Sequence, residues 1–155
     1  MKIRPPALGG GGLDGVINVE GERKLSASEL SSLALAFVGD AVYNLFIRTM
    51  VVGSGKKVKD LHLEAVKYVR ASAQAEALKK IEKYLTPEER HIVRMARNAK
   101  VNTVPKNADI MDYHYSTGFE ALLGYLYLSG KNDRLNKILM ASFELVNSGQ
   151  DTSRS

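Results

Sequence analysis

Two acidic residues stand out because each is the sole charged residue in a long apolar run. Asp40 lies within residues 33–42, and Glu120 lies within residues 119–128. A glycine directly precedes Asp40 and another follows Glu120 by four residues, which lets two helix backbones approach closely. An ionised carboxylate is costly to bury unless a cation or strong donors meet it. Two such helices packed together would bring both acids to one shared cation.

The chemistry that suits this pair of acids is the binding of Mg²⁺ or Mn²⁺, which prefer carboxylate oxygens together with water. The alternative is that each acid points to solvent or pairs with an arginine such as Arg48 or Arg94. For either acid alone the alternative is the better interpretation. For the matched pair, the sequence leaves the two interpretations level.

A basic segment provides the second candidate site. Residues 90–106 contain no acid, and Arg90, Arg94 and Arg97 share one helical face at spacings of four and three. Arginine forks in such a row suit the phosphate backbone of a nucleic acid, although a solvated helix face gives the same pattern. The following loop adds polar donors that could touch sugar or base edges in RNA. The predicted RNA-binding residues are Arg90, Arg94, Arg97, Asn98, Lys100, Thr103, Lys106 and Asn107.

The elements that must position these residues are all predicted to be helices. A capping box formed by Ser26 and Glu29 predicts the start of the Asp40 helix, which ends near Gly53. Its predicted buried stripe comprises Leu30, Leu33, Ala34, Phe37, Val38, Ala41, Val42, Leu45 and Phe46.

Periodicity predicts one or two helices within residues 57–85, and Thr86-Pro87-Glu88-Glu89 predicts the start of the arginine helix. Residues 99–112 form a predicted loop. The Glu120 helix is expected over about 112–128 and a last helix over 133–146. No segment alternates with period two, so the predicted fold class is all-α.

Composition places the chain among basic globular proteins. It has 155 residues, 22 Lys plus Arg against 17 Asp plus Glu, and no cysteine, which excludes disulfides and thiol catalysis. Neither a signal peptide nor a membrane-spanning run is predicted, so a cytoplasmic location is expected. The predicted organisation is a flexible glycine-rich arm at 1–25, one catalytic domain at 26–148 and a frayed tail at 149–155.

These residues resemble the ribonuclease III family, and in particular its short bacterial form, which lacks a double-stranded-RNA-binding domain. The match spans about residues 28–147. It is carried by the segments Ala34–Val42 and Tyr115–Tyr125, which are general to ribonuclease III domains, and by Arg97–Lys100 and Thr103–Asn107, which are particular to the short form.

The resemblance implies a helical homodimer that holds double-stranded RNA in a valley. Asp40 and Glu120 match the family's metal-binding catalytic acids, with Mg²⁺ as cofactor and Mn²⁺ as a substitute. The cut would leave 5′-phosphate and 3′-hydroxyl ends, and the expected substrate is the 23S ribosomal RNA precursor, with a ribosomal protein as a possible aid. Longer family members carry two further acids where this chain has Ala36 and Thr117, which leaves the number of metals open.

A rival from another functional class is a non-catalytic helical protein that binds double-stranded RNA or the ribosome. Such a protein would keep the fold and the basic segment but would have no need of the acid pair. The retention of both Asp40 and Glu120 favours the enzyme.

Overall fold

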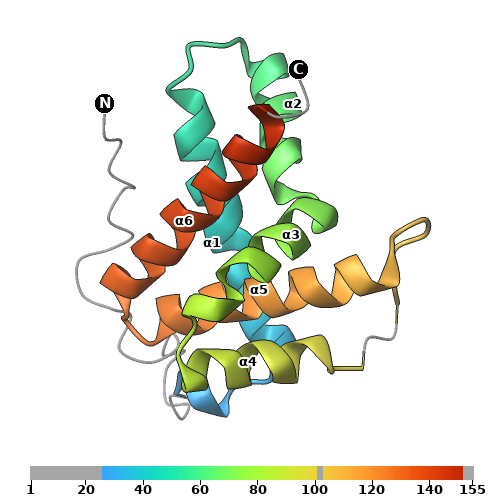
Figure 1. Ribbon diagram of the computed structural model, residues 1–155, viewed down its shortest axis with the longest axis vertical. Coiled ribbons are helices and arrows are strands. Elements are labelled where there is room, and N and C mark those ends of the chain that lie inside the picture. Colours follow the sequence, from blue (N-terminus) through green and yellow to red (C-terminus); the bar gives the residue numbers. More distant parts are fainter. Residues whose placement is uncertain (1–25, 101–102, 152–155) are drawn as a thin grey trace, which may run out of the picture.

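The computed structural model describes residues 26–100 and 103–151, and every regular element in this part of the chain is a helix (Figure 1). The predicted all-α class is therefore confirmed. The elements are η1 (Ala27–Glu29), α1 (Ser32–Val52), α2 (Val58–Val69), α3 (Ala71–Ile81), η2 (Glu82–Tyr84), α4 (Pro87–Arg97), α5 (Ile110–Leu128) and α6 (Asn132–Asp151), where η marks a 3₁₀ turn.

Helix α5 is the centre of the fold. It lies across the middle of the molecule, with α1 behind it and α3 in front of it, and α4 packs along it (Figure 1). Its residues Phe119, Leu122 and Leu126 are fully buried. The Glu120 helix thus contacts the Asp40 helix, the helix that bears the arginines and α3.

Helices α1 and α5 touch through their backbones at two glycines. A Cβ added at Gly39 would lie 1.6 Å from the carbonyl oxygen of Glu120, and one added at Gly124 would lie 1.9 Å from the carbonyl oxygen of Leu35. No side chain fits at either position. The glycines near the two acids therefore mark the place where the two helices cross.

The buried side of α1 differs from the predicted side. Leu33, Phe37 and Leu45 were expected in the core, but all three are exposed, Phe37 by 81%. The helix instead buries the face that contains Leu35, Gly39, Val42, Tyr43, Phe46, Ile47 and Met50. Because α1 is apolar on nearly all sides, its periodicity could not indicate which face would meet α5.

The start of α1 also differs from the prediction. The Glu29 carboxylate does accept a hydrogen bond from the Ser26 backbone at 2.8 Å, but this pair encloses only the short turn η1. Leu30 is extended, so the chain leaves helical geometry there. Ser31 then caps α1 by accepting a hydrogen bond from the Ala34 backbone at 3.1 Å.

The other predicted helices are present. Residues 57–85 hold α2, α3 and η2, and Pro87 begins α4 after a Thr86–Glu89 capping box, as predicted. Helix α6 reaches Asp151, beyond the predicted end near Val146. The predicted arm at 1–25 lies outside the described residues, as does the end of the predicted tail from residue 152.

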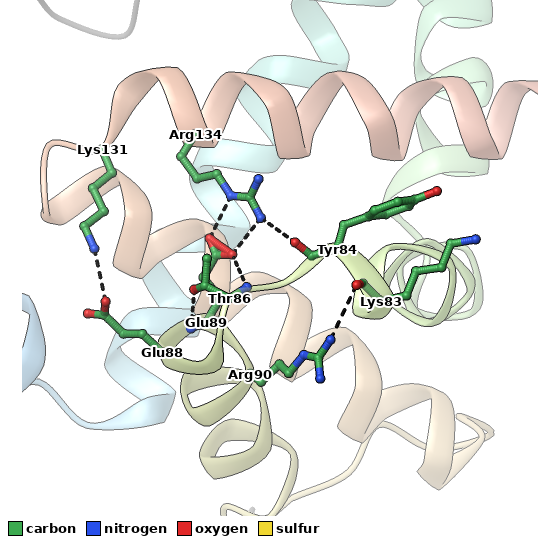
Figure 2. Close-up of polar contacts among 8 residues, drawn as sticks. All are labelled: Lys83, Tyr84, Thr86, Glu88, Glu89, Arg90, Lys131 and Arg134. Carbon is green, nitrogen blue, oxygen red and sulfur yellow. Dashed lines mark hydrogen bonds and ion pairs between the residues drawn. The ribbon is translucent and has the colours of Figure 1, made fainter.

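A buried ion pair joins the start of α4 to the start of α6. The Arg134 guanidinium donates two hydrogen bonds to the Glu89 carboxylate, at 2.9 and 2.8 Å, and a third to the Tyr84 carbonyl at 2.9 Å (Figure 2). The Glu89 side chain is only 5% exposed. Arg134 and the Thr86 cap together lower the pKa of Glu89 although burial opposes them.

Helix α1 is long and apolar enough to cross a membrane by length and composition, contrary to the prediction that no run reaches that length. About half of this helix is buried inside the protein. Its buried half packs on α5, as expected for a core helix.

Candidate active site

The backbone contact between α1 and α5 brings the two predicted acids together. Asp40 follows Gly39 in α1, and the carbonyl that Gly39 approaches belongs to Glu120 itself. The negative charge of Asp40 is close enough to raise the pKa of Glu120. The structure thus brings together two residues that are 80 positions apart in the sequence.

Asp40 is exposed at the edge of α1, and a neighbour on the same helix holds its side chain. The Asn44 amide donates one hydrogen bond to the Asp40 carboxylate at 3.0 Å and another to the Asp40 carbonyl at 2.8 Å. Asn44 is one helical turn from Asp40, so the spacing of four in the sequence carried a signal for this contact. The bond restricts the orientation of the carboxylate.

Glu120 is in the opposite situation, because its carboxylate is half-buried. Burial and the nearby charge of Asp40 raise the pKa of Glu120 to about 7, although a hydrogen bond from Gln74 acts to lower it. Among the ion pairs of the described residues, none joins a cation to Asp40 or Glu120. The pairing with Arg48 or Arg94 that the sequence left open is therefore not formed.

The acid pair fits a divalent cation by the chemistry of its donors. Two carboxylates held near each other without a counter-charge form a site of concentrated negative potential, and a hard cation relieves both the repulsion and the burial cost. Within the described part of the chain, no group of three or more Asp, Glu, His or Cys could hold a metal. Two carboxylates match a hydrated Mg²⁺ or Mn²⁺, which keeps several of its waters.

The predicted arginines lie around a hollow of about 390 Å³ between η2 and α4. Arg90 and Arg94 are exposed, and their side chains make only long contacts, to the Lys83 carbonyl and to His91, both at 3.4 Å. Lys83 also lines this hollow, and the sequence analysis did not predict it because it precedes the arginine helix. The hollow is lined by Glu82, Lys83, Leu85, Arg90, Val93, Arg94 and Arg97.

Arg97 differs from the other two arginines because it makes contacts within the protein. Its guanidinium carbon lies 3.8 Å from the centre of the Tyr115 ring, and Nη1 lies 3.6 Å from the Glu82 carboxylate. Its side-chain stem also lies where a Cβ on Gly118 would be. Arg97 therefore helps to join α4 to α5, a role that its spacing in the sequence did not indicate.

The remaining predicted RNA-binding residues lie at the end of α4 and in the loop before α5. Asn98 is the C-cap of α4. Asn107 has φ of 71°, a left-handed conformation that asparagine tolerates better than most residues. The exposed members of this group are Asn98, Lys100, Thr103, Lys106 and Asn107.

Comparison with known proteins agrees with this fold and site. The family model of the Ribonuclease III domain matches residues 33–131. A Mini-ribonuclease 3 from Thermoanaerobacter is 52% identical over 83% of this chain and 92% of its own length, and one from Symbiobacterium thermophilum is 46% identical over 78% and 94%. A crystal structure of a Fusobacterium nucleatum protein superposes with a TM-score of 0.70 at 33% identity, covering 79% of this chain and 95% of that one.

The matched domain and the helical architecture define the class as a ribonuclease III-type endoribonuclease. Within this class, the chain belongs to the Mini-ribonuclease 3 family, because its identity to those proteins extends over most of both chains.

Proposed function

We propose that this protein is a Mg²⁺-dependent endoribonuclease that cleaves double-stranded RNA, with Asp40 and Glu120 as its catalytic metal ligands. The observation that carries the proposal is the crossing of α1 and α5, which places two acids together without a cation and raises the pKa of Glu120 to about 7. Membership of the ribonuclease III family supports the reaction type. Mn²⁺ is expected to substitute for Mg²⁺ because both accept oxygen ligands.

In this proposal, the carboxylates of Asp40 and Glu120 bind the cation, and RNA and water complete its coordination. The bound cation supplies a water of lowered pKa and positive charge beside the phosphoryl oxygens. Asn44 keeps the Asp40 carboxylate oriented through its 3.0 Å hydrogen bond. Glu120 must be ionised to act as a ligand, so protons and metal compete for it near neutral pH.

The RNA is proposed to contact the exposed basic side chains. Arg90 and Arg94 are exposed with only long polar contacts, so they are free to bind phosphate, whereas Arg97 is engaged with Tyr115. The loop donors at Asn98, Lys100, Thr103, Lys106 and Asn107 extend this surface. Phosphate contacts of this kind weaken steeply with salt because binding releases counterions from the RNA.

A homodimer is also part of the proposal. The outer face of α1 exposes apolar side chains at every fourth position, namely Leu33, Phe37, Ala41 and Leu45. Exposed apolar patches of this kind mark interfaces in many proteins. Replacing Phe37 with glutamate is expected to give a monomer by analytical ultracentrifugation, and a dimer of unchanged affinity would exclude this face.

The proposed substrate is a stem of the 23S ribosomal RNA precursor, in the cytoplasm, with a ribosomal protein assisting its presentation. The support is the resemblance of residues 97–100 and 103–107 to the short form of ribonuclease III. Cleavage of that stem in preference to a duplex of equal length and unrelated sequence would support this choice.

The test of the enzyme is cleavage of a labelled RNA duplex with Mg²⁺ and with EDTA. We expect wild-type protein to cut only with Mg²⁺, and Asp40→Asn and Glu120→Gln each to cut more than about 100-fold more slowly while still binding the duplex. Glu144→Gln is the matched control, since Glu144 is an exposed acid on α6. Duplex binding without cutting by the wild type would favour the non-catalytic rival.

A further inference from the structure

Gln74 is a polar residue in a position that suits an apolar one. It lies in the first turns of α3 and is 1% exposed, and its neighbours Ala73, Ala75 and Leu78 are also buried. Burying an amide costs free energy unless each of its polar atoms finds a partner. A glutamine retained at such a position is therefore expected to do something besides packing.

One hydrogen bond fixes the Gln74 amide at the junction of two helices. Its nitrogen donates to the carbonyl oxygen of Val69, the last residue of α2, at 2.8 Å. The intervening residue, Arg70, caps both α2 and α3. A primary amide carries two donor hydrogens, so one remains for another acceptor.

The second acceptor is the Glu120 carboxylate on α5. Burial and the charge of Asp40 raise the pKa of Glu120, and the hydrogen bond from Gln74 opposes this rise. A donor bond to a carboxylate favours its ionised form, which is the form that binds a cation. Gln74 therefore acts on Glu120 in the direction that metal binding requires.

The other end of the amide is unmatched. The Gln74 carbonyl oxygen is buried and has no hydrogen-bond partner among the described residues. A methionine has nearly the same length and would fill this place without an unmet acceptor. The chain thus keeps a residue that lowers its stability at the point of contact with a catalytic acid, and such conflicts are typical of functional sites.

We propose that Gln74 is a positioning residue of the active site: its amide ties the Glu120 carboxylate to the α2–α3 junction and keeps it in place as a metal ligand. This inference rests on the proposed function. Side chains that hydrogen-bond to metal ligands typically change metal affinity by about 10–100-fold when they are removed. Gln74 would be such a residue, supplied by α3 in addition to the helices that carry the acids.

The test is a titration of metal-free protein with Mn²⁺, with free Mn²⁺ measured by electron paramagnetic resonance. We expect Gln74→Met to weaken Mn²⁺ binding about ten-fold. In a Glu120→Gln background the same substitution should add nothing, because Gln74 acts through Glu120. Ser142→Ala is the matched control, as Ser142 is fully buried in α6 and donates to the Ile138 carbonyl; its Mn²⁺ affinity should equal the wild type's.

Stability separates positioning from folding. The thermal midpoint of Gln74→Met is expected to equal or exceed that of the wild type, and Gln74→Leu provides a second variant should methionine pack badly. Mn²⁺ affinity equal to the wild type's in the folded variant would overturn the inference, as would an equal loss in both backgrounds. A wild type that binds Mn²⁺ no better than Asp40→Asn would overturn the proposed function as well.

Discussion

The chain handles buried carboxylates in two opposite ways. At the junction of α4 and α6, Glu89 accepts two hydrogen bonds from Arg134, and its pKa is lowered (Figure 2). At the crossing of α1 and α5, Glu120 faces the negative charge of Asp40, and its pKa is raised to about 7. One carboxylate has its cation supplied by the protein, and the other does not.

The difference shows which region serves stability and which serves chemistry. The Glu89–Arg134 pair fastens two helices and leaves its carboxylate oxygens occupied. The Asp40–Glu120 pair is held together by backbone contact at glycines and leaves its charge uncompensated. An uncompensated pair lowers stability, and perturbed pKa values of this kind cluster at functional sites.

The largest expected effect comes from separating the helices that carry the acid pair. Gly39→Ala places a Cβ 1.6 Å from the Glu120 carbonyl, so α1 and α5 must move apart. We expect a loss of at least about 4 kcal/mol in the free energy of unfolding, measured with urea. Gly53→Ala is the control, because its Cβ meets nothing closer than the Met50 carbonyl at 3.7 Å. Equal stability of the two variants would contradict the close crossing.

The next effect comes from removing the cation at the other region. Arg134→Met leaves Glu89 buried without a partner, which costs about 3–5 kcal/mol in a fully buried pair. Arg134 is 32% exposed, so we expect the lower end, about 3 kcal/mol. Lys80→Met breaks the exposed pair with Glu76 and should change the unfolding free energy by less than about 0.5 kcal/mol. Similar losses for both variants would show that the Glu89 pair is no stronger than a surface pair.

The two carboxylates should also give stability opposite dependences on pH. Because the folded pKa of Glu120 is raised to about 7, its contribution falls as pH rises from 4.5 to 7. Glu89 has a lowered pKa, so its contribution is present above 4.5 and is lost as pH falls through its folded value.

Glu120→Gln should remove the first of these dependences. We expect this variant to gain about 2 kcal/mol relative to the wild type between pH 4.5 and pH 8, since one pKa unit corresponds to about 1.4 kcal/mol and partial exposure reduces the effect. Denaturation at a series of pH values measures it. Glu89→Gln is expected to lose stability relative to the wild type over the same range, and parallel curves for all three proteins would refute the contrast.

The smallest expected effect is a change in one pKa. Asp40→Asn removes the charge beside Glu120, so the Glu120 pKa should fall. It should stay above 4.5, because burial is the larger cause and remains. Titration of the Glu120 carboxyl carbon by NMR measures the change. An unchanged pKa would mean that the two acids are too far apart to share a cation.

The sequence predicted the features that depend on local pattern. The all-α class, the capping of α4 at Thr86 and the meeting of the Asp40 and Glu120 helices follow from composition and short-range spacing. The buried side of α1 did not follow, because Phe37 and Phe46 are equally apolar and only the contact with α5 decides between them. The roles of Gln74 and Arg97 depend on partners 46 and 18 residues away, Glu120 and Tyr115, which no local pattern encodes.

The crossing of α1 with α5 has a consequence for synthesis of the protein on the ribosome. Asp40 is translated 80 residues before Glu120, which corresponds to roughly 4–16 s at ordinary rates of elongation. The contact joins distant parts of the chain, so it forms late, once α5 has left the exit tunnel. The nascent chain therefore has no assembled pair of acids while it is still attached to the RNA of the ribosome that makes it.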